Sequence, residues 1–309
     1  MKVFQGSQAA HNKIKRPVLA LGNFDGLHLA HQKLLQVTLQ LAKQCRGTPC
    51  VYSFVPHPVK VLSPQSAPPL ISTLQQKNQL IKKQKIKALI LEPFLKDFSD
   101  LSAEEFFEKI LVKKLGIAGV VAGYDFTFGS KRSGNADLLK ELCNQQGIPC
   151  KIISAQHQQN TLISSSQIRS FIQKGSVDQA TELLGRPFEI LGVVVKGDGI
   201  GTSLGFPTAN ILTENELIPG NGVYATQVKI GLRTYNSITN IGFRPTFGGK
   251  KLTLETHIFR FKKKIYGKEI RIRFIKKIRD EITFASVQDL IKQIKKDVES
   301  AQRIFKNIS

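Results

Sequence analysis

The feature that most limits the fold of this chain is a change of pattern near its middle. In the first half, short apolar runs that are typical of buried strands alternate with longer segments of helical periodicity. The expected strands cover 17–21, 50–55, 88–91 and 120–122, and the expected helices cover 30–44, 72–85 and 102–115. Such alternation predicts a parallel sheet covered by helices, as in α/β proteins.

The second half contains strand patterns only from residue 187 to residue 274, separated by glycine-rich turns. Two helical pieces over 164–184, broken at Lys174–Gly175, precede this region, and a final helix begins at Ser286. Several short strands at regular spacing predict a small antiparallel barrel. We therefore expect two domains, 1–183 and 184–309, in agreement with a prior of about 150 residues per domain.

The charge of the chain is strongly positive, because its 45 Lys and Arg outnumber its 23 Asp and Glu and give a net charge of +22. A basic surface attracts phosphate on nucleotides, nucleic acid or anionic membranes, although a solvated surface explains the charge equally well. The densest stretch, 244–279, alternates many of its charges with apolar residues, as a strand with one wet face does. Without a run of 18 apolar residues or an RNA-binding signature, we expect neither membrane nor nucleic acid as a partner.

The cysteines are too few for a disulfide scaffold and lack the C-x2-C pairs of a zinc site. They are Cys45, Cys50, Cys143 and Cys150. We expect them to be reduced, in a cytoplasmic protein, since the first residues also lack the apolar segment of a secretory signal. With 41% apolar residues the chain can build real cores, which excludes a disordered chain.

The first candidate site is the turn that follows the apolar run 17–21. The turn reads GNFDG over residues 22–26, and His28 and His31 then open a helix. Open α/β sheets bind ligands at the carboxyl ends of strands, and a helix N-terminus offers free N–H groups and partial positive charge. Two imidazoles that share one helix face can donate to phosphate oxygens. The pattern predicts a polyphosphate site, and two ordinary surface histidines are the alternative.

A second group of phosphate-binding residue types lies at the start of the helical region. Ser164, Ser165 and Ser166 precede a helix, and Arg169 follows one turn later. Hydroxyls, helix N–H groups and a guanidinium can together clamp a triphosphate. A plain serine N-cap is the alternative explanation.

The barrel region has a candidate site of its own in the glycine-rich loop 197–205. Backbone N–H groups at Gly199, Gly201 and Gly205 can wrap phosphates. Thr208 and Asn210 alternate along an extended chain, so their oxygens face the same side, as a pair of Mg²⁺ ligands needs. An ordinary barrel loop is the alternative.

These motifs occur in the order found in bacterial bifunctional riboflavin kinases/FMN adenylyltransferases, and the chain resembles that family. The His28–His31 segment looks like the HxGH signature of nucleotidyltransferases, and the glycine loop with its Thr and Asn looks like riboflavin kinase. Further matching segments are 54–58, 123–129, 163–169, 240–247, 254–257, 266–268 and 279–284. The resemblance implies a Rossmann-like nucleotidyltransferase domain followed by a kinase barrel with a C-terminal helix. It also implies ATP-dependent conversion of riboflavin to FMN and of FMN to FAD, with Mg²⁺.

The resemblance further implies roles for individual residues. Glu255 would be the general base on the ribityl 5′-hydroxyl, since a carboxylate within reach of a hydroxyl can take its proton. His28, His31 and Arg169 would stabilise charge on the triphosphate of the second reaction. The implied phosphate contacts are Gly22, Asn23, Asp25, Ser164, Ser165, Gly199, Gly201 and Gly205. The implied flavin or nucleotide pocket contains Phe54, His57, Asp125 and Arg279, and the implied metal ligands are Thr208 and Asn210.

Four residues depart from the family pattern, and the mildest change is Ser166, where the family usually has threonine. Ala30 replaces the glycine of the HxGH signature, and Ile200 and Thr202 stand where basic residues are common. Their effect on rate, the retention of both activities and the oligomeric state stay open at this point. An alternative is a nucleotidyltransferase for another small molecule, with a barrel that only binds a ligand.

Overall fold

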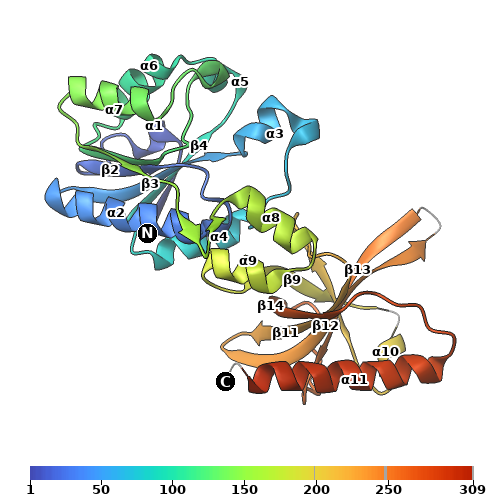
Figure 1. Ribbon diagram of the computed structural model, residues 1–309. Helices are drawn as coiled ribbons and strands as arrows, with labels where there is room; N and C mark the ends of the chain where they lie inside the picture. Colours follow the sequence, from blue (N-terminus) through green and yellow to red (C-terminus); the bar gives the residue numbers. More distant parts are fainter. Residues whose placement is uncertain (198, 247–248, 308–309) are drawn as a thin grey trace. The chain divides into compact units, whose positions relative to one another are not determined.

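A computed structural model describes residues 1–197, 199–246 and 249–307 and divides them into two compact units (Figure 1). The first unit contains 1–69 and 74–164, and the second contains 70–73 and 165–309. Asp198 of the glycine loop and Phe247 of the segment 240–247 lie outside the described residues, as do the side chains of Ile200 and of residues 243–246 and 249–251. The domain boundary at 183/184 stays a prediction.

The first unit contains a parallel sheet of six strands in the order β1-β4-β3-β2-β5-β6. The strands are β1 (Lys2–Gln5), β2 (Pro17–Leu21), β3 (Thr48–Val55), β4 (Ala88–Pro93), β5 (Gly119–Gly123) and β6 (Cys150–Ile153). From β2 the chain runs outward to β3 and β4, and it returns with β5 on the other side of β2. The order therefore reverses between β2 and β5, and such a switch point is where open α/β sheets bind ligands.

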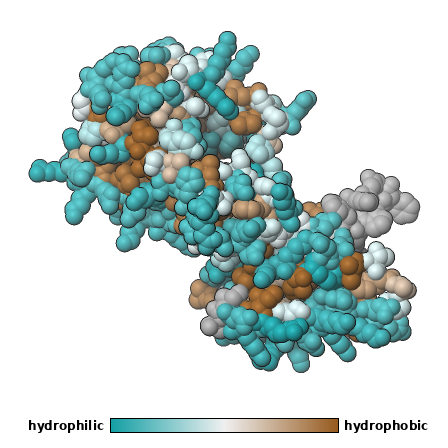
Figure 2. Space-filling view, in the orientation of Figure 1, coloured by the Kyte–Doolittle hydropathy of each residue, from teal (hydrophilic) through white to brown (hydrophobic). Residues whose placement is uncertain are grey.

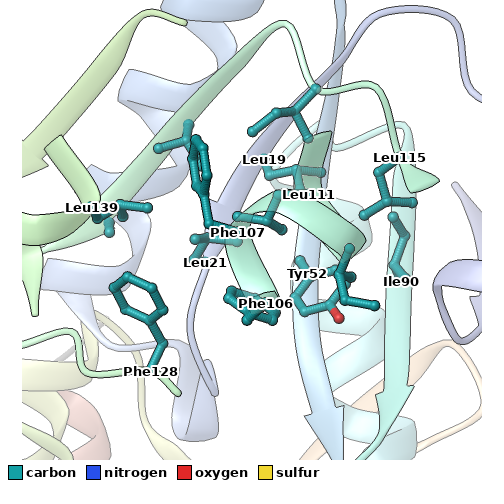
Figure 3. Packing of buried hydrophobic residues seen from close by; sticks show 14 of the residues in the cluster. Leu19, Leu21, Tyr52, Ile90, Phe106, Phe107, Leu111, Leu115, Phe128 and Leu139 are labelled. Atoms are coloured by element: carbon teal, nitrogen blue, oxygen red, sulfur yellow. The ribbon is translucent and has the colours of Figure 1, made fainter. Parts of the chain in front are cut away.

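Helices cover both faces of this sheet, as Figure 1 shows for α2 on one side and α1, α6 and α7 on the other. The α-helices are α1 (Ser7–Ala10), α2 (Leu29–Gln44), α3 (Pro58–Leu62), α4 (Leu74–Lys83), α5 (Lys96–Ser99), α6 (Ala103–Glu105) and α7 (Ala136–Gln145). Successive residues of a strand point to opposite faces. Leu19 and Leu21 therefore pack in one core with Phe106 (Figure 3), and Val18 and Ala20 pack in the other core with α2.

The expected helix over 102–115 begins as predicted and then widens. Ser102 and Glu105 form a capping box, because each backbone N–H donates to the other side chain, at 3.0 and 3.1 Å. From Phe106 to Lys114 the helix is a π-helix, η3. Its four buried apolar residues join the first core beneath it. Periodicity alone does not distinguish this wider turn from an α-helix.

The second unit begins with two helices and continues as a closed barrel. The helices are α8 (Ser165–Gln173) and α9 (Val177–Leu184), the two pieces expected around Lys174–Gly175. The barrel order is β10-β13-β12-β11-β14-β9, and β9 pairs with β10 to close it. Its strands are β9 (Phe188–Val195), β10 (Ala209–Thr213), β11 (Gly222–Ile230), β12 (Arg233–Thr246), β13 (Gly249–Ile258) and β14 (Glu269–Arg279). The fold class expected from the sequence is confirmed in both halves.

Helix α11 (Val287–Lys306) packs on the outside of the barrel. Its N-cap is Ser286, the predicted start, whose hydroxyl accepts from the backbone N–H of Asp289 at 3.1 Å. Ala301 and Phe305 of the helix contact β11 and β12. One face of the barrel is therefore covered by apolar contacts.

The barrel interior contains a ladder of buried hydroxyl groups. The Oγ1 atom of Thr226 lies 2.8 Å from Ser237 Oγ and 2.7 Å from Thr239 Oγ1, and Thr239 Oγ1 lies 2.9 Å from Thr256 Oγ1. Each hydroxyl can both donate and accept, so these polar groups are satisfied without water. Because the side chain of Thr256 points into the barrel, the side chains of its two neighbours on the strand, residues 255 and 257, point outward.

The surface in view in Figure 2 is mostly hydrophilic, over both units. Across the described ranges, none of the helices combines the length and the apolar character needed to cross a bilayer. All four cysteines are free thiols.

Candidate active sites

The first site is built by the turn between β2 and α2, at the switch point of the sheet. Phe24, with a φ of 53°, and Gly26, with a φ of 72°, turn the chain through the 3₁₀ segment η1 (Asp25–Leu27). His28 is the N-cap of α2, and its Nδ1 atom accepts from the backbone N–H of His31 at 3.3 Å. The two imidazole rings stack with centroids 3.6 Å apart and planes 15° apart. The helix N-terminus thus presents a preformed pair of histidines.

Electrostatics favour a neutral His31 in the free protein. Its pKa lies well below the usual 6.5, first because burial disfavours the charged ring and then because His28 and Lys77 are positive neighbours. Its Nδ1 atom and the Oδ1 atom of Asn23 are buried and have no hydrogen-bond partner among the described residues. An anionic ligand at this helix N-terminus would supply such a partner and favour imidazole protonation.

Ala30 lies within α2 with helical backbone geometry. The alanine therefore fits the position that the HxGH signature gives to glycine, without a positive φ. The helix was expected from Ala30 and begins one residue earlier, at Leu29.

Lys77 of α4 belongs to this site and was not expected from the sequence. Its Nζ atom donates to the carbonyl oxygen of Asn23 at 3.2 Å and to Ser53 Oγ at 3.1 Å. Burial lowers the pKa of Lys77 to about 8, although the nearby Asp25 carboxylate raises it in part. A polar helix with several lysines gives no sequence signal that one of them is buried.

The expected pocket residues of the first unit lie in three local environments. Phe54 joins an aromatic cluster, with ring centroids 5.5 Å from both Tyr52 and Phe94. His57 is the N-cap of α3, and its Nδ1 atom accepts from the Val59 N–H at 3.3 Å. Asp125 is exposed in the turn after β5, the strand that pairs with β2. That turn and the Gly22 turn therefore lie at the same edge of the sheet.

The serine and arginine group spans the division between the compact units. Ser164 ends the first unit, and Ser165 and Arg169 lie on α8 of the second. Arg169 is buried, whereas the two serines are half-buried. Their shared role at a triphosphate stays a prediction.

The second site is a row of polar side chains across three barrel strands. Glu255 of β13 is directly paired with Asn210 of β10 on one side and with Asn240 of β12 on the other. Directly opposite residues share a face and have Cβ atoms about 4.5–5.5 Å apart. The register thus brings the expected base and one expected metal ligand together, and it adds Asn240, a member of the segment 240–247 for which no role was expected.

The glycine loop folds back onto the expected metal ligands. Gly199 and Gly205 have φ values of 76° and 85°, which side-chain-bearing residues rarely adopt. A Cβ atom built on Gly201 would lie 2.9 Å from Thr208 Oγ1, and one on Gly197 would collide with the side chain of Asn210. Only glycine fits at these close approaches, so the loop wraps directly around the Thr208–Asn210 segment.

His257 fixes the segment that carries Thr208. Its Nδ1 atom lies 2.9 Å from the carbonyl oxygen of Pro207, and its ring meets Phe206 edge-on at 5.7 Å. His257 is two residues from Glu255 on the same outward face of β13. One strand therefore supplies the carboxylate and holds the loop beside it.

Arg279, an expected pocket residue, makes an ion pair in the structure. Its Nε and Nη2 atoms donate to both carboxylate oxygens of Asp297, at distances of 2.8 to 3.1 Å. It also lies over the Phe284 ring at 5.8 Å. These contacts join the end of β14 to α11.

The donors near Glu255 are oxygen atoms, the ligands that Mg²⁺ prefers. The hydroxyl of Thr208 and the amide oxygen of Asn210, the two expected ligands, fit such an ion. Within the described part of the chain, no group of three or more His, Cys, Asp or Glu side chains is placed to hold a metal ion.

Comparisons with known proteins match both units in tandem. A model of the FAD synthetase family matches residues 10–167, and a model of the riboflavin kinase family matches residues 184–305. A protein of Buchnera aphidicola subsp. Schizaphis graminum, named bifunctional riboflavin kinase/FMN adenylyltransferase, is 37% identical and covers 99% of both chains. A protein of the same name from Bacillus subtilis strain 168 is 36% identical over 96% of both chains.

A solved structure resembles the whole chain. It is a crystal structure of a Streptococcus pneumoniae protein described as a macrolide-efflux protein, with a TM-score of 0.89 and 31% sequence identity. The match covers 97% of this chain and 98% of that one. The likeness therefore extends over both compact units.

Proposed function

Because the chain belongs to the bifunctional riboflavin kinase/FMN adenylyltransferase family, we propose that it makes both flavin coenzymes from riboflavin. The barrel domain transfers the γ-phosphoryl group of ATP to riboflavin, which gives FMN and ADP. The sheet domain transfers AMP from a second ATP to the phosphate of FMN, which gives FAD and pyrophosphate. The domains proposed for these reactions are 184–309 and 1–183, and consumption of ATP in both steps favours the cytoplasm.

In the kinase reaction, Glu255 acts as general base. Its carboxylate takes the proton of the ribityl 5′-hydroxyl as the hydroxyl oxygen attacks the γ-phosphorus and the bond to the β-phosphate oxygen breaks. The side chain of Glu255 points outward from β13, and the residue is paired directly with Asn210. Both observations support this role. Backbone N–H groups of the loop at Gly199, Gly201 and Gly205 hold the phosphates of ATP.

Thr208 and Asn210 hold Mg²⁺ in this proposal. The ion, when bound, neutralises charge on the phosphates of ATP. The close approach of Gly201 to Thr208 supports a metal and phosphate site on this segment, because the loop that would hold phosphate lies directly on the expected ligand.

In the adenylyl-transfer reaction, a phosphate oxygen of FMN attacks the α-phosphorus of ATP and pyrophosphate leaves. His28 and His31 donate hydrogen bonds to the phosphate oxygens, where negative charge develops. Gly22, Asn23 and Asp25 form the turn around the phosphates. The unpartnered Nδ1 atom of His31 and the low pKa of the ring support a group that gains its partner from the ligand.

The remaining proposed contacts rest on the family resemblance. Ser164, Ser165 and Arg169 contact the triphosphate. Phe54, His57 and Asp125 serve the flavin or nucleotide of the sheet domain, and Arg279 serves that of the barrel.

One observation carries the proposal. The stacked histidine pair and the row containing Glu255 lie in different compact units, and each lies within the residues matched by the family model for the corresponding activity. Two independent phosphoryl-type reactions need two such sites.

The test is incubation of the full chain with riboflavin, ATP and Mg²⁺, followed by chromatographic separation of the flavins. We expect FMN first and FAD later. Neither flavin product would contradict the proposal and favour a nucleotidyltransferase for another small molecule, with a barrel that only binds a ligand. FMN without FAD would show that the sheet domain lacks its proposed activity.

A further inference from the structure

A buried ammonium group lies beneath the turn that carries the histidines. Lys77 is only 9% exposed, whereas Lys82 and Lys83 on the same helix α4 are exposed to solvent. Removing an ammonium group from water is costly unless hydrogen bonds and negative charge replace its hydration. The burial of Lys77 therefore indicates a specific role for its ammonium group.

Lys77 makes two hydrogen bonds to two other elements, and a third bond between those elements closes a triangle. Lys77 Nζ donates to the Asn23 carbonyl and to Ser53 Oγ, at 3.2 and 3.1 Å. Ser53 Oγ in turn donates to the same carbonyl at 3.1 Å. Helix α4, the end of β3 and the turn after β2 are thus tied at one point, five residues before His28.

We propose that Lys77 is a positioning residue for FMN adenylylation: its ammonium group fixes the Gly22–Asn23 turn to β3 and so holds the backbone that aims His28 and His31 at the triphosphate. This role rests on the proposed function of the sheet domain. Precise placement of groups around reacting atoms contributes strongly to rate, and small displacements are costly.

The charges around Lys77 support the same role. Asp25 is the negative neighbour that favours the ammonium form, and His31 is the neutral ring on which Lys77 acts. His28 stacks on that ring from the N-cap of α2. Because the pKa of Lys77 is lowered to about 8, its charge is present below pH 8 and is lost above it.

The experiment compares four variants of the full chain: Lys77→Met, Lys77→Arg, Ser53→Ala and, as the matched control, Lys82→Met. FAD formation from FMN and FMN formation from riboflavin are measured on the same preparations. We expect Lys77→Met to lower kcat/KM for FAD formation by roughly 10- to 100-fold, the range for a lost charged hydrogen bond, and Ser53→Ala by about 3- to 10-fold. FMN formation should stay within about twofold in all four variants, and Lys82→Met should leave both reactions within that range.

The pH profile separates positioning by a charged group from ordinary packing. In the unaltered chain, FAD formation should decline above about pH 8 as Lys77 loses its proton. Lys77→Arg should have lower activity at pH 7 but keep that activity to higher pH, because a guanidinium stays protonated. FMN formation by the same chain should not show this decline.

The outcomes are distinguishable. Absence of FAD formation by the unaltered chain contradicts the proposed function itself. If the unaltered chain makes FAD, then unchanged FAD formation in Lys77→Met and Ser53→Ala, or an equal loss of both activities, overturns the role of Lys77. Where Lys77→Met does not fold, the Ser53→Ala rates and the Lys77→Arg pH profile decide in the same way.

Discussion

The two histidines at the start of α2 act as one unit in the structure. Their rings stack, and His28 also caps the helix by accepting the N–H of His31. Removing one ring would therefore disturb the other. For this reason the informative variant replaces both.

The double variant His28→Ala/His31→Ala should abolish FAD formation, with a loss of at least about 100-fold. FMN formation should stay within about twofold, because the proposed kinase residues lie in the other compact unit. Chromatography of the flavins formed from riboflavin and ATP measures both. Loss of both activities from folded protein would contradict separate sites.

Glu255→Ala should have the converse effect. Without the carboxylate, the ribityl hydroxyl keeps its proton, and FMN formation should fall by roughly 10²- to 10⁴-fold. With FMN supplied directly, FAD formation should match that of the unaltered chain. Normal FMN formation by this variant would exclude Glu255 as the base.

The sequence indicates candidate site residues through local motifs, but it gives no indication of Lys77, for a physical reason. Motifs such as GNFDG and the Thr208–Asn210 pair are local, so their spacing alone indicates chemistry. The contacts of Lys77 to Asn23 and Ser53 span 54 and 24 residues. Only the fold brings such residues together.

At the level of elements, the attachment of α11 to the barrel depends on one buried carboxylate. Asp297 is 2% exposed and accepts from Arg279 and from Gln293 Nε2, the latter at 2.8 Å. Removing one partner of a buried pair leaves the other uncompensated.

Asp297→Ala should therefore lower the free energy of unfolding by roughly 2–3 kcal/mol, below the largest values for such pairs because the Arg279 guanidinium keeps some contact with water. Glu299→Ala, an exposed change on the same helix, should have an effect within about 0.5 kcal/mol. Urea unfolding of both variants measures the difference. Equal midpoints would show that apolar contacts alone hold the helix.

The elements that sequence reasoning found and missed differ in length and burial. Strands β2 to β5 were predicted because parallel strands buried on both faces read as apolar runs. The missed strand β1 has mostly exposed residues. It depends on pairing with the distant strand β4, which the local pattern does not indicate.

At the scale of the whole molecule, the net charge of +22 has a kinetic consequence. A positive field raises the encounter rate of anionic substrates, and salt screens it over about 10 Å at 0.1 M. FMN is an anion, whereas riboflavin is uncharged. Comparing the two flavin substrates therefore isolates the effect of the positive field, because only one of them is charged.

Raising NaCl from about 50 to 500 mM should increase the KM for FMN several-fold and leave the KM for riboflavin within about twofold, at saturating ATP. Steady-state assays of the two reactions on one preparation provide the comparison. Equal salt dependence for both flavins would show that the charge does not guide substrate.

The separation of the two sites into different compact units also bears on coenzyme supply. With the proposed assignment of the reactions, slowing one centre leaves the other at full speed, so a single substitution in one unit changes how much mononucleotide accumulates relative to dinucleotide. Mutational tuning of the sheet domain alone would thus give a cell a graded shift in its flavin pool from a gene that still encodes one polypeptide.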